Sequence, residues 1–161
     1  MKKIKLPLTK AVIKKLKPGE WVLLNGPLLT ARDAAHKRMV EAKRSPVSIK
    51  DETIYYTGPT PARKGQVIGS CGPTTSARMD VFTPALLKQG LLGIIGKGER
   101  SKDVGRAIKK SGAVYFITIG GAGAYLSEKV CSSKVVAYKD LGTEAIRRLI
   151  VKDFPAIVAI K

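Results

Sequence analysis

The stretch Gly69-Ser70-Cys71-Gly72-Pro73-Thr74-Thr75-Ser76-Ala77-Arg78-Met79-Asp80 joins a short apolar segment to a predicted helix. Two hydroxyl side chains follow the Gly-Pro turn, and Ser76 is expected to cap the helix after them. A turn beside a helix N-terminus exposes backbone N–H groups, which favour a carboxylate or a phosphate. Arg78 adds a planar, two-pronged donor that matches a carboxylate. The stretch therefore predicts an anion-binding turn with a candidate acid/base hydroxyl.

On both sides of this turn, apolar segments bounded by Gly and Pro alternate with amphipathic ones. Helices are expected over 30–43, with Thr30 and Asp33 as a capping box, and over 76–90, 101–111, 122–129 and 143–151. Strands are expected over 21–24, 53–57, 66–69, 92–95, 114–119, 135–138 and 156–160. The run at 114–119 is almost entirely apolar, which is typical of a strand covered on both faces. The alternation implies an α/β fold with a central sheet, and residues 1–161 have the size of a single domain.

Several motifs resemble one family. Gly-Pro-Thr-Thr-Ser-Ala-Arg-Met-Asp at 72–80 resembles the signature of the β subunit, or C-terminal domain, of class I iron–sulfur fumarases and of the similar L-tartrate dehydratases. The resemblance covers most of the chain and keeps the family's order. The other matching segments are Thr30–His36 with its Arg-Asp-x-x-His pattern, Tyr55–Pro61, Ile95–Gly98, Tyr115–Phe116, Ile119–Ala122 and Tyr138–Gly142.

The resemblance implies a swivelling β/β/α-type domain, a compact central mixed sheet flanked by helices that docks against a larger catalytic partner. It implies a hydro-lyase that adds water reversibly to fumarate to give (S)-malate. L(+)-tartrate dehydratase is an alternative of the same class, and nothing in the sequence separates the two. The implied partner is a cysteine-containing α subunit that holds a 4Fe-4S cluster, in a dimer of αβ units.

The same resemblance assigns roles to particular residues. It makes Thr74 the base that abstracts a proton, assisted by an aspartate of the other subunit, because a free threonine is a poor base. It makes Arg32, Arg78 and Lys97 ligands of the substrate carboxylates, and Thr75 a further substrate-binding residue. The three cations lie at strand-to-helix turns, where open α/β sheets bind ligands. Solvated surface charge, and threonines that only satisfy a turn, are the structural alternatives.

The remaining polar candidates are few. His36 is the sole histidine and lies four residues after Arg32, so both fall on one helical face, and its role is open between catalysis and structure. Cys71 and Cys131 make no disulfide framework and indicate a reducing, cytoplasmic compartment. Cys71 is expected to be a buried small residue. An iron–sulfur cluster needs three or four thiolates, so two cysteines cannot hold one, and no metal site is expected in this chain.

The net charge of +18 is the one feature of the sequence that indicates a different function, nucleic-acid binding. The first fifty residues hold 13 Lys and Arg against three Asp and Glu, which admits a nucleic-acid-binding module as an alternative. Aromatic residues make up only 6%, and no RNP-like or zinc-finger pattern accompanies the lysines. We expect the excess charge to meet an acidic partner subunit and to steer a dianionic substrate. Salt-dependent retention on DNA or RNA would favour the alternative. No signal peptide or membrane span is expected.

Overall fold

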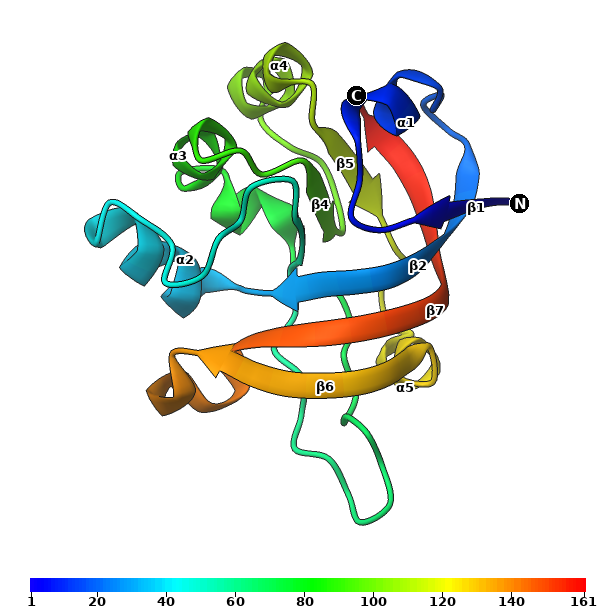
Figure 1. Cartoon of the computed structure of the whole chain (residues 1–161), viewed down its shortest axis with the longest axis vertical. Helices are drawn as coiled ribbons and strands as arrows, with labels where there is room; N and C mark the ends of the chain where they lie inside the picture. The colour runs from blue at the N-terminus through cyan, green and yellow to red at the C-terminus, as the bar shows by residue number, and fades with distance from the viewer.

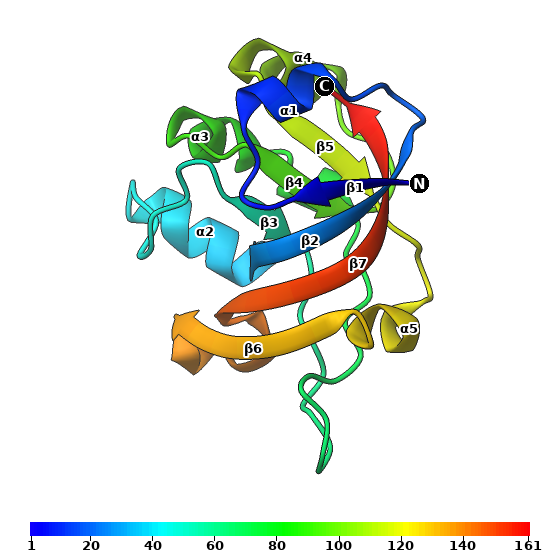
Figure 2. The same cartoon turned by 45° about the vertical axis from the view of Figure 1, so that its right-hand side comes forward.

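Seven strands form one mixed sheet, which is so strongly curved that its second and seventh strands also pair with each other (Figures 1 and 2). The structure is a computed structural model and describes residues 1–161. The strands are β1 (Lys2–Lys5), β2 (Trp21–Thr30), β3 (Thr53–Tyr55), β4 (Gly93–Gly96), β5 (Val114–Ile117), β6 (Val130–Ala137) and β7 (Ile146–Ile160). The helices are α1 (Lys10–Lys14), α2 (Asp33–Glu41), α3 (Thr83–Lys88), α4 (Lys102–Ser111) and α5 (Gly123–Ser127), with 3₁₀ turns η1 (Ser76–Met79) and η2 (Lys139–Glu144).

The sheet closes through β2 and β7. Its strand order is β1-β2-β3-β4-β5-β7-β6, and an additional antiparallel pairing joins β2 to β7. Strands β1 to β5 pair with one another in parallel, whereas β7 runs antiparallel to β2, β5 and β6. The predicted α/β fold with a central mixed sheet flanked by helices is therefore confirmed. Its barrel-like closure is a feature that the sequence pattern did not predict.

The segment that closes the barrel was predicted wrongly. We expected a helix over 143–151 and a separate strand over 156–160, but Ile146–Ile160 is one strand of 15 residues. Glu144, Ala145 and the arginines after them favour a helix locally. The segment instead pairs with β2 on one side and β6 on the other, and tertiary pairing of this kind overrides local propensity.

Three further local predictions differ from the structure. Residues 66–69 are not a strand but belong to a long connection after β3, which projects from the body of the molecule in both views (Figures 1 and 2). The single helix expected over 76–90 is divided into η1 and α3. The Thr30 hydroxyl does not cap α2, because it accepts from the Arg147 N–H at 3.1 Å and so joins β2 to β7.

The prediction over 101–111 is confirmed at both ends. The Ser101 hydroxyl accepts a hydrogen bond from the Val104 N–H at 3.3 Å, and Gly112 ends α4 in the left-handed conformation with φ of 72°. Strand β5 is covered on both faces as expected, since Val114 and Phe116 belong to one apolar core and Tyr115 to the other.

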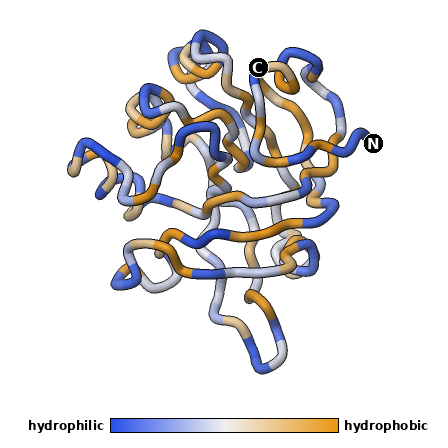
Figure 3. Tube along the Cα trace, in the orientation of Figure 1, coloured by the Kyte–Doolittle hydropathy of each residue, from blue (hydrophilic) through white to orange (hydrophobic).

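The two cores lie on opposite faces of the curled sheet. One fills its inside, with Leu24, Phe116 and Phe154 fully buried. The other lies between the outer face and helices α2, α3 and α4, which contribute Met39, Leu86 and other residues. In Figure 3 hydrophobic and hydrophilic segments alternate along the strands and around the helices. None of the helices has both the length and the apolar character needed to cross a membrane.

Candidate functional site

Four of the five predicted site residues lie at one edge of the sheet: Arg32 and Lys97 follow parallel strands, and Thr74 and Thr75 are hydrogen-bonded or bridged to residues that follow such strands. Because β2, β3 and β4 run parallel, their carboxyl ends meet at one edge of the sheet. Arg32 follows β2, and Lys97 follows β4 directly. Thr75 forms an isolated parallel bridge with Lys97, which brings the Thr74-Thr75 turn to the same edge. The turn, Arg32 and Lys97 therefore belong to one region. Arg32 and Lys97 follow strands as predicted, whereas the turn follows no strand and reaches this edge through its pairing with Lys97.

Backbone hydrogen bonds hold the turn between two strand ends. The Thr74 N–H donates to the Tyr56 carbonyl at 2.7 Å, just after β3. The Ser76 N–H donates to the Lys97 carbonyl at 3.0 Å, just after β4. Both neighbouring strands thus fix the backbone of the two threonines, so the threonine side chains have a defined direction.

The two threonine hydroxyls differ in exposure. Thr74 has 9% of its surface exposed, and its hydroxyl makes no hydrogen bond within the chain. Thr75 is exposed and precedes η1 without capping it. Asp80, the one carboxylate in this stretch, is bonded to Arg100 instead. The Thr74 hydroxyl therefore has no hydrogen-bond partner in this chain to which it could pass a proton.

Ser76 was expected to cap a helix, and this prediction is wrong. Its side chain points into the protein, where the Tyr115 hydroxyl lies 2.8 Å from the serine oxygen. The contact needs a glycine on β4, because a Cβ at Gly96 would lie 1.9 Å from the Ser76 oxygen. Burial raises the pKa of Tyr115 to about 12, so its hydroxyl keeps its proton. Ser76 therefore packs the turn against the sheet.

A buried arginine beneath the turn was missed at the sequence level. The Arg100 side chain is completely buried, and its Nε lies 2.6 Å from Asp80 Oδ1. Its Nη2 donates to the Thr83 hydroxyl at 2.7 Å, and its guanidinium lies 5.0 Å from the centre of the Tyr115 ring. Asp80 and Arg100 are 20 residues apart, so no local pattern reveals the pair. Asp80 is thus a partner of Arg100 and not of Thr74.

Asp33 brings the two predicted arginines together. Arg78 approaches its carboxylate with two nitrogens, Nε to Oδ1 at 3.0 Å and Nη2 to Oδ2 at 2.7 Å. Arg32 Nε lies 3.5 Å from the same Oδ2 and 3.4 Å from Glu144 Oε1. The Arg32 side chain also lies over Gly58, where a Cβ would be 2.8 Å from the arginine Cδ. The structure therefore places Arg32 and Arg78 side by side.

Lys97 differs from the two arginines because it makes no ion pair with a carboxylate of this chain. It is half-buried at the end of β4, and its Cδ passes near Gly120, which follows β5. Its ammonium group is therefore available to an anion at this edge.

His36 lies behind Arg32, completely buried. Its Nδ1 lies 2.8 Å from the Arg32 carbonyl oxygen. Because a carbonyl oxygen can only accept a hydrogen bond, Nδ1 is the ring nitrogen that carries the proton. Nε2 is buried without a partner, and the Tyr56 ring packs edge-on at a centroid distance of 5.2 Å. Burial lowers the pKa of His36 to about 4, so the ring is neutral at pH 7. The geometry favours the structural role for His36, since Nε2 has no path to a ligand.

The neutral histidine predicts a pH dependence of stability. The unfolded chain binds a proton at His36 near pH 6.5 and the folded chain only near pH 4, so acid favours unfolding in this window. Between pH 7 and pH 5 we expect His36 to account for a loss of about 2 kcal/mol in the free energy of unfolding. Urea unfolding of the wild type and of His36→Asn at both pH values measures this loss. The variant should lose less between pH 7 and pH 5, and an equal loss in both proteins would contradict a neutral, buried His36.

The cysteines do not fit an iron–sulfur cluster. Cys71 is buried, as expected, and burial raises the pKa of its thiol to about 11, whereas cluster ligands are thiolates. Cys131 lies exposed on β6. No group of three His, Cys, Asp or Glu side chains is arranged to hold a metal ion. The donors of this chain therefore cannot form such a centre by themselves.

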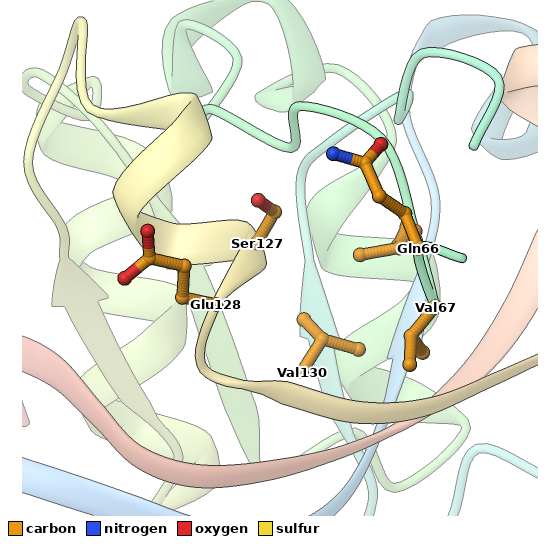
Figure 4. Close-up of a pocket in the computed structure, with 6 residues that line it drawn as sticks. Gln66, Val67, Ser127, Glu128 and Val130 are labelled. Carbon is orange, nitrogen blue, oxygen red and sulfur yellow. The ribbon is translucent and has the colours of Figure 1, made fainter. Parts of the chain in front are cut away.

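A cavity of about 210 Å³ lies apart from the predicted residues, between the projecting connection and the segment of α5 and β6 (Figure 4). Its lining residues are Gln66, Val67, Ile68, Ser127, Glu128 and Val130. The one charged side chain among them is Glu128, which would repel a carboxylate. The cationic edge described above is the better candidate site.

The fold and this edge define the class of protein: a mixed α/β domain whose strand ends gather cations and hydroxyls suited to a carboxylate ligand. The chain belongs to the fumarase C-terminus family, whose family model matches residues 1–161. The predicted family is thereby confirmed.

Curated relatives carry two kinds of name. The aerobic class I fumarate hydratase of Escherichia coli K12 is 41% identical over 143 residues, which cover 85% of this chain and 26% of the relative. Fumarate hydratase 2 of Leishmania major is 38% identical over 148 residues, covering 88% and 26%. The chain thus spans about a quarter of the length of these relatives. A putative L(+)-tartrate dehydratase subunit beta of Methanocaldococcus jannaschii is 38% identical over 162 residues, covering 94% of this chain and 83% of that subunit.

Proposed function

We propose that this chain is the β subunit of a heteromeric iron–sulfur hydro-lyase that hydrates fumarate reversibly to (S)-malate. The observation that carries the proposal is the single edge where Thr74, Arg32, Arg78 and Lys97 are gathered in a member of the fumarase C-terminus family. The putative L(+)-tartrate dehydratase relative of Methanocaldococcus jannaschii is named a subunit beta. That name supports a partner that completes the enzyme.

In the dehydration direction, Thr74 takes the proton from C3 of malate. Negative charge then develops on the neighbouring carboxylate, where Arg32, Arg78 and Lys97 stabilise it as hydrogen-bond donors and cations. The C2 hydroxyl next leaves with a proton as water, and the electron pair left at C3 forms the double bond of fumarate. A cluster held by the partner would supply a Lewis acid for the departing hydroxyl. Thr75 lies beside Lys97 and contacts the substrate from the same edge. Because the Thr74 hydroxyl has no partner in its own chain, the group that relays its proton belongs to the partner, as the resemblance implies.

The partner is a cysteine-containing α subunit that holds the 4Fe-4S cluster, since the donors of this chain do not fit one. The assembly is a dimer of αβ units in the cytoplasm. The net charge of +18 favours an acidic partner surface and draws in a dianionic substrate.

Subunit dependence tests this proposal. Purified alone under anaerobic conditions, the chain should show neither the brown absorbance of a cluster nor fumarate hydration. Co-expressed with the cysteine-containing α subunit that the proposal requires, it should yield a complex with both properties. Robust hydration by the single chain would contradict the proposal, and a complex without hydration or dehydration activity would do so as well.

L(+)-tartrate is the second candidate substrate, and the β-subunit relative of Methanocaldococcus jannaschii favours it. Tartrate differs from malate by one hydroxyl, so the same cations would bind its carboxylates. The ratio of kcat/KM for malate and L(+)-tartrate, measured on the assembled complex, separates the two substrates.

A further inference from the structure

We infer that Asp33 is a positioning residue that turns one edge of the Arg78 guanidinium toward a substrate carboxylate. The inference rests on the proposed function, and it assigns a role to a carboxylate that the predicted site did not include. Its basis is the manner in which Asp33 and Arg78 meet.

A guanidinium has two edges that each present a pair of parallel N–H groups, Nε with Nη2 and Nη1 with Nη2. Asp33 occupies the first edge, at 3.0 Å from Nε and 2.7 Å from Nη2. The Nη1 atom of Arg78 makes no hydrogen bond within the chain, and half of the side chain is exposed. The second edge is therefore free for a two-pronged bond to a ligand.

Asp33 is itself held firmly enough to orient a partner. It is the first residue of α2, where a negative charge is favourable, and Arg32 approaches its Oδ2 at 3.5 Å. Burial alone would raise the pKa of Asp33, but hydrogen bonds from its own backbone N–H and from Arg78, with the charges of Arg78 and Arg32, lower it below the usual value. The Asp33 carboxylate is therefore ionised at neutral pH and remains paired with Arg78.

The local charge makes this orientation important. Asp33 and Glu144 face Arg78 and Arg32, so two carboxylates balance two guanidiniums and leave Lys97 as the excess cation. Attraction of a substrate carboxylate to the arginine pair then depends on hydrogen-bond geometry more than on net charge. A rotated Arg78 would lose a bidentate contact although its charge remained.

The test is a double-mutant cycle on the assembled αβ complex. Asp33→Asn should raise the KM for fumarate about tenfold and change kcat much less, because the bond it weakens is made to bound substrate. Arg78→Lys should raise KM as well, since an ammonium has no second edge to present. In the Arg78→Lys background, Asp33→Asn should have little further effect, which is the coupling expected of residues that act through one contact.

Asp140→Asn is the matched control. Like Asp33, Asp140 binds an arginine through both carboxylate oxygens, here Arg38 at 2.9 and 2.7 Å, and this pair is exposed and includes none of the predicted site residues. Its loss should leave KM unchanged. Should Asp33→Asn not assemble, Asp33→Glu keeps the charge, moves the carboxylate by one methylene, and should raise KM in the same Arg78-dependent way.

An unchanged KM in the Asp33 variant would overturn the inference, as would an equal increase in both Arg78 backgrounds. Either result leaves the proposed function intact, because wild-type hydration is measured in the same assay. Absence of wild-type activity would instead count against the proposed function.

Discussion

Thr74→Val is expected to assemble with the partner and bind fumarate, yet turn over about 100-fold more slowly or worse, the scale on which a general acid or base contributes. Valine keeps the shape of threonine and removes only the hydroxyl. Thr74 is almost buried, and its hydroxyl makes no hydrogen bond in the chain, so its loss leaves no internal partner unsatisfied. Steady-state hydration by the complex, with KM determined separately, measures the effect.

Thr75→Val is the matched control at the adjacent position. Thr75 is exposed and caps no helix, so its hydroxyl is expected to contribute to substrate binding alone. Turnover should fall much less than in Thr74→Val. A larger loss of turnover in Thr75→Val would move the base one residue along, and full activity in both variants would place the base on the partner chain.

Asp80→Asn is expected to lower the free energy of unfolding by about 3 kcal/mol, because it leaves a buried guanidinium without its counter-charge. Asp80 accepts from Arg100 Nε at 2.6 Å through one oxygen and from the Ser101 N–H at 2.8 Å through the other. Asparagine can accept at only one of these positions, and its amide would direct a donor toward the other donor. Urea unfolding of the purified chain measures the loss.

The control for this substitution is Asp103→Asn. Asp103 also pairs with an arginine, Arg106, but both side chains lie in solvent, where such pairs contribute little. It should change the free energy of unfolding only slightly. An equally small change for Asp80→Asn would show that Arg100 does not depend on its carboxylate.

The parts of the fold that follow from local pattern were predictable from the sequence. Helix α4 carries its own capping residues, Ser101 before its first residue and Gly112 after its last. The strand that begins at Val114 is apolar enough to be covered on both faces. Strand β7 was not predictable in this way, because Ile146 and the residues after it are held by pairing with strands distant in sequence. Closure of the sheet depends on that same pairing.

The site shows the same division. The positions of Arg32 and Lys97 could be predicted, since each follows a strand of a parallel set. The Thr74-Thr75 turn follows no strand, and its place at this edge depends on its bridge to Lys97. The roles of Asp33 and of Arg100 could not, because each depends on a contact between segments 20 or more residues apart. For Asp33 the only available signal was its position next to Arg32, and for Arg100 the sequence offered none.

Exchange of the C3 proton of malate with deuterated solvent tests the central role of Thr74 most directly, because it follows the proton and not the overall reaction. We expect the assembled wild-type complex to exchange this proton, the Thr75→Val complex to retain most of the exchange, and the Thr74→Val complex to lose it in step with turnover. Near-normal exchange in Thr74→Val would contradict the assignment of the base to this chain's Thr74.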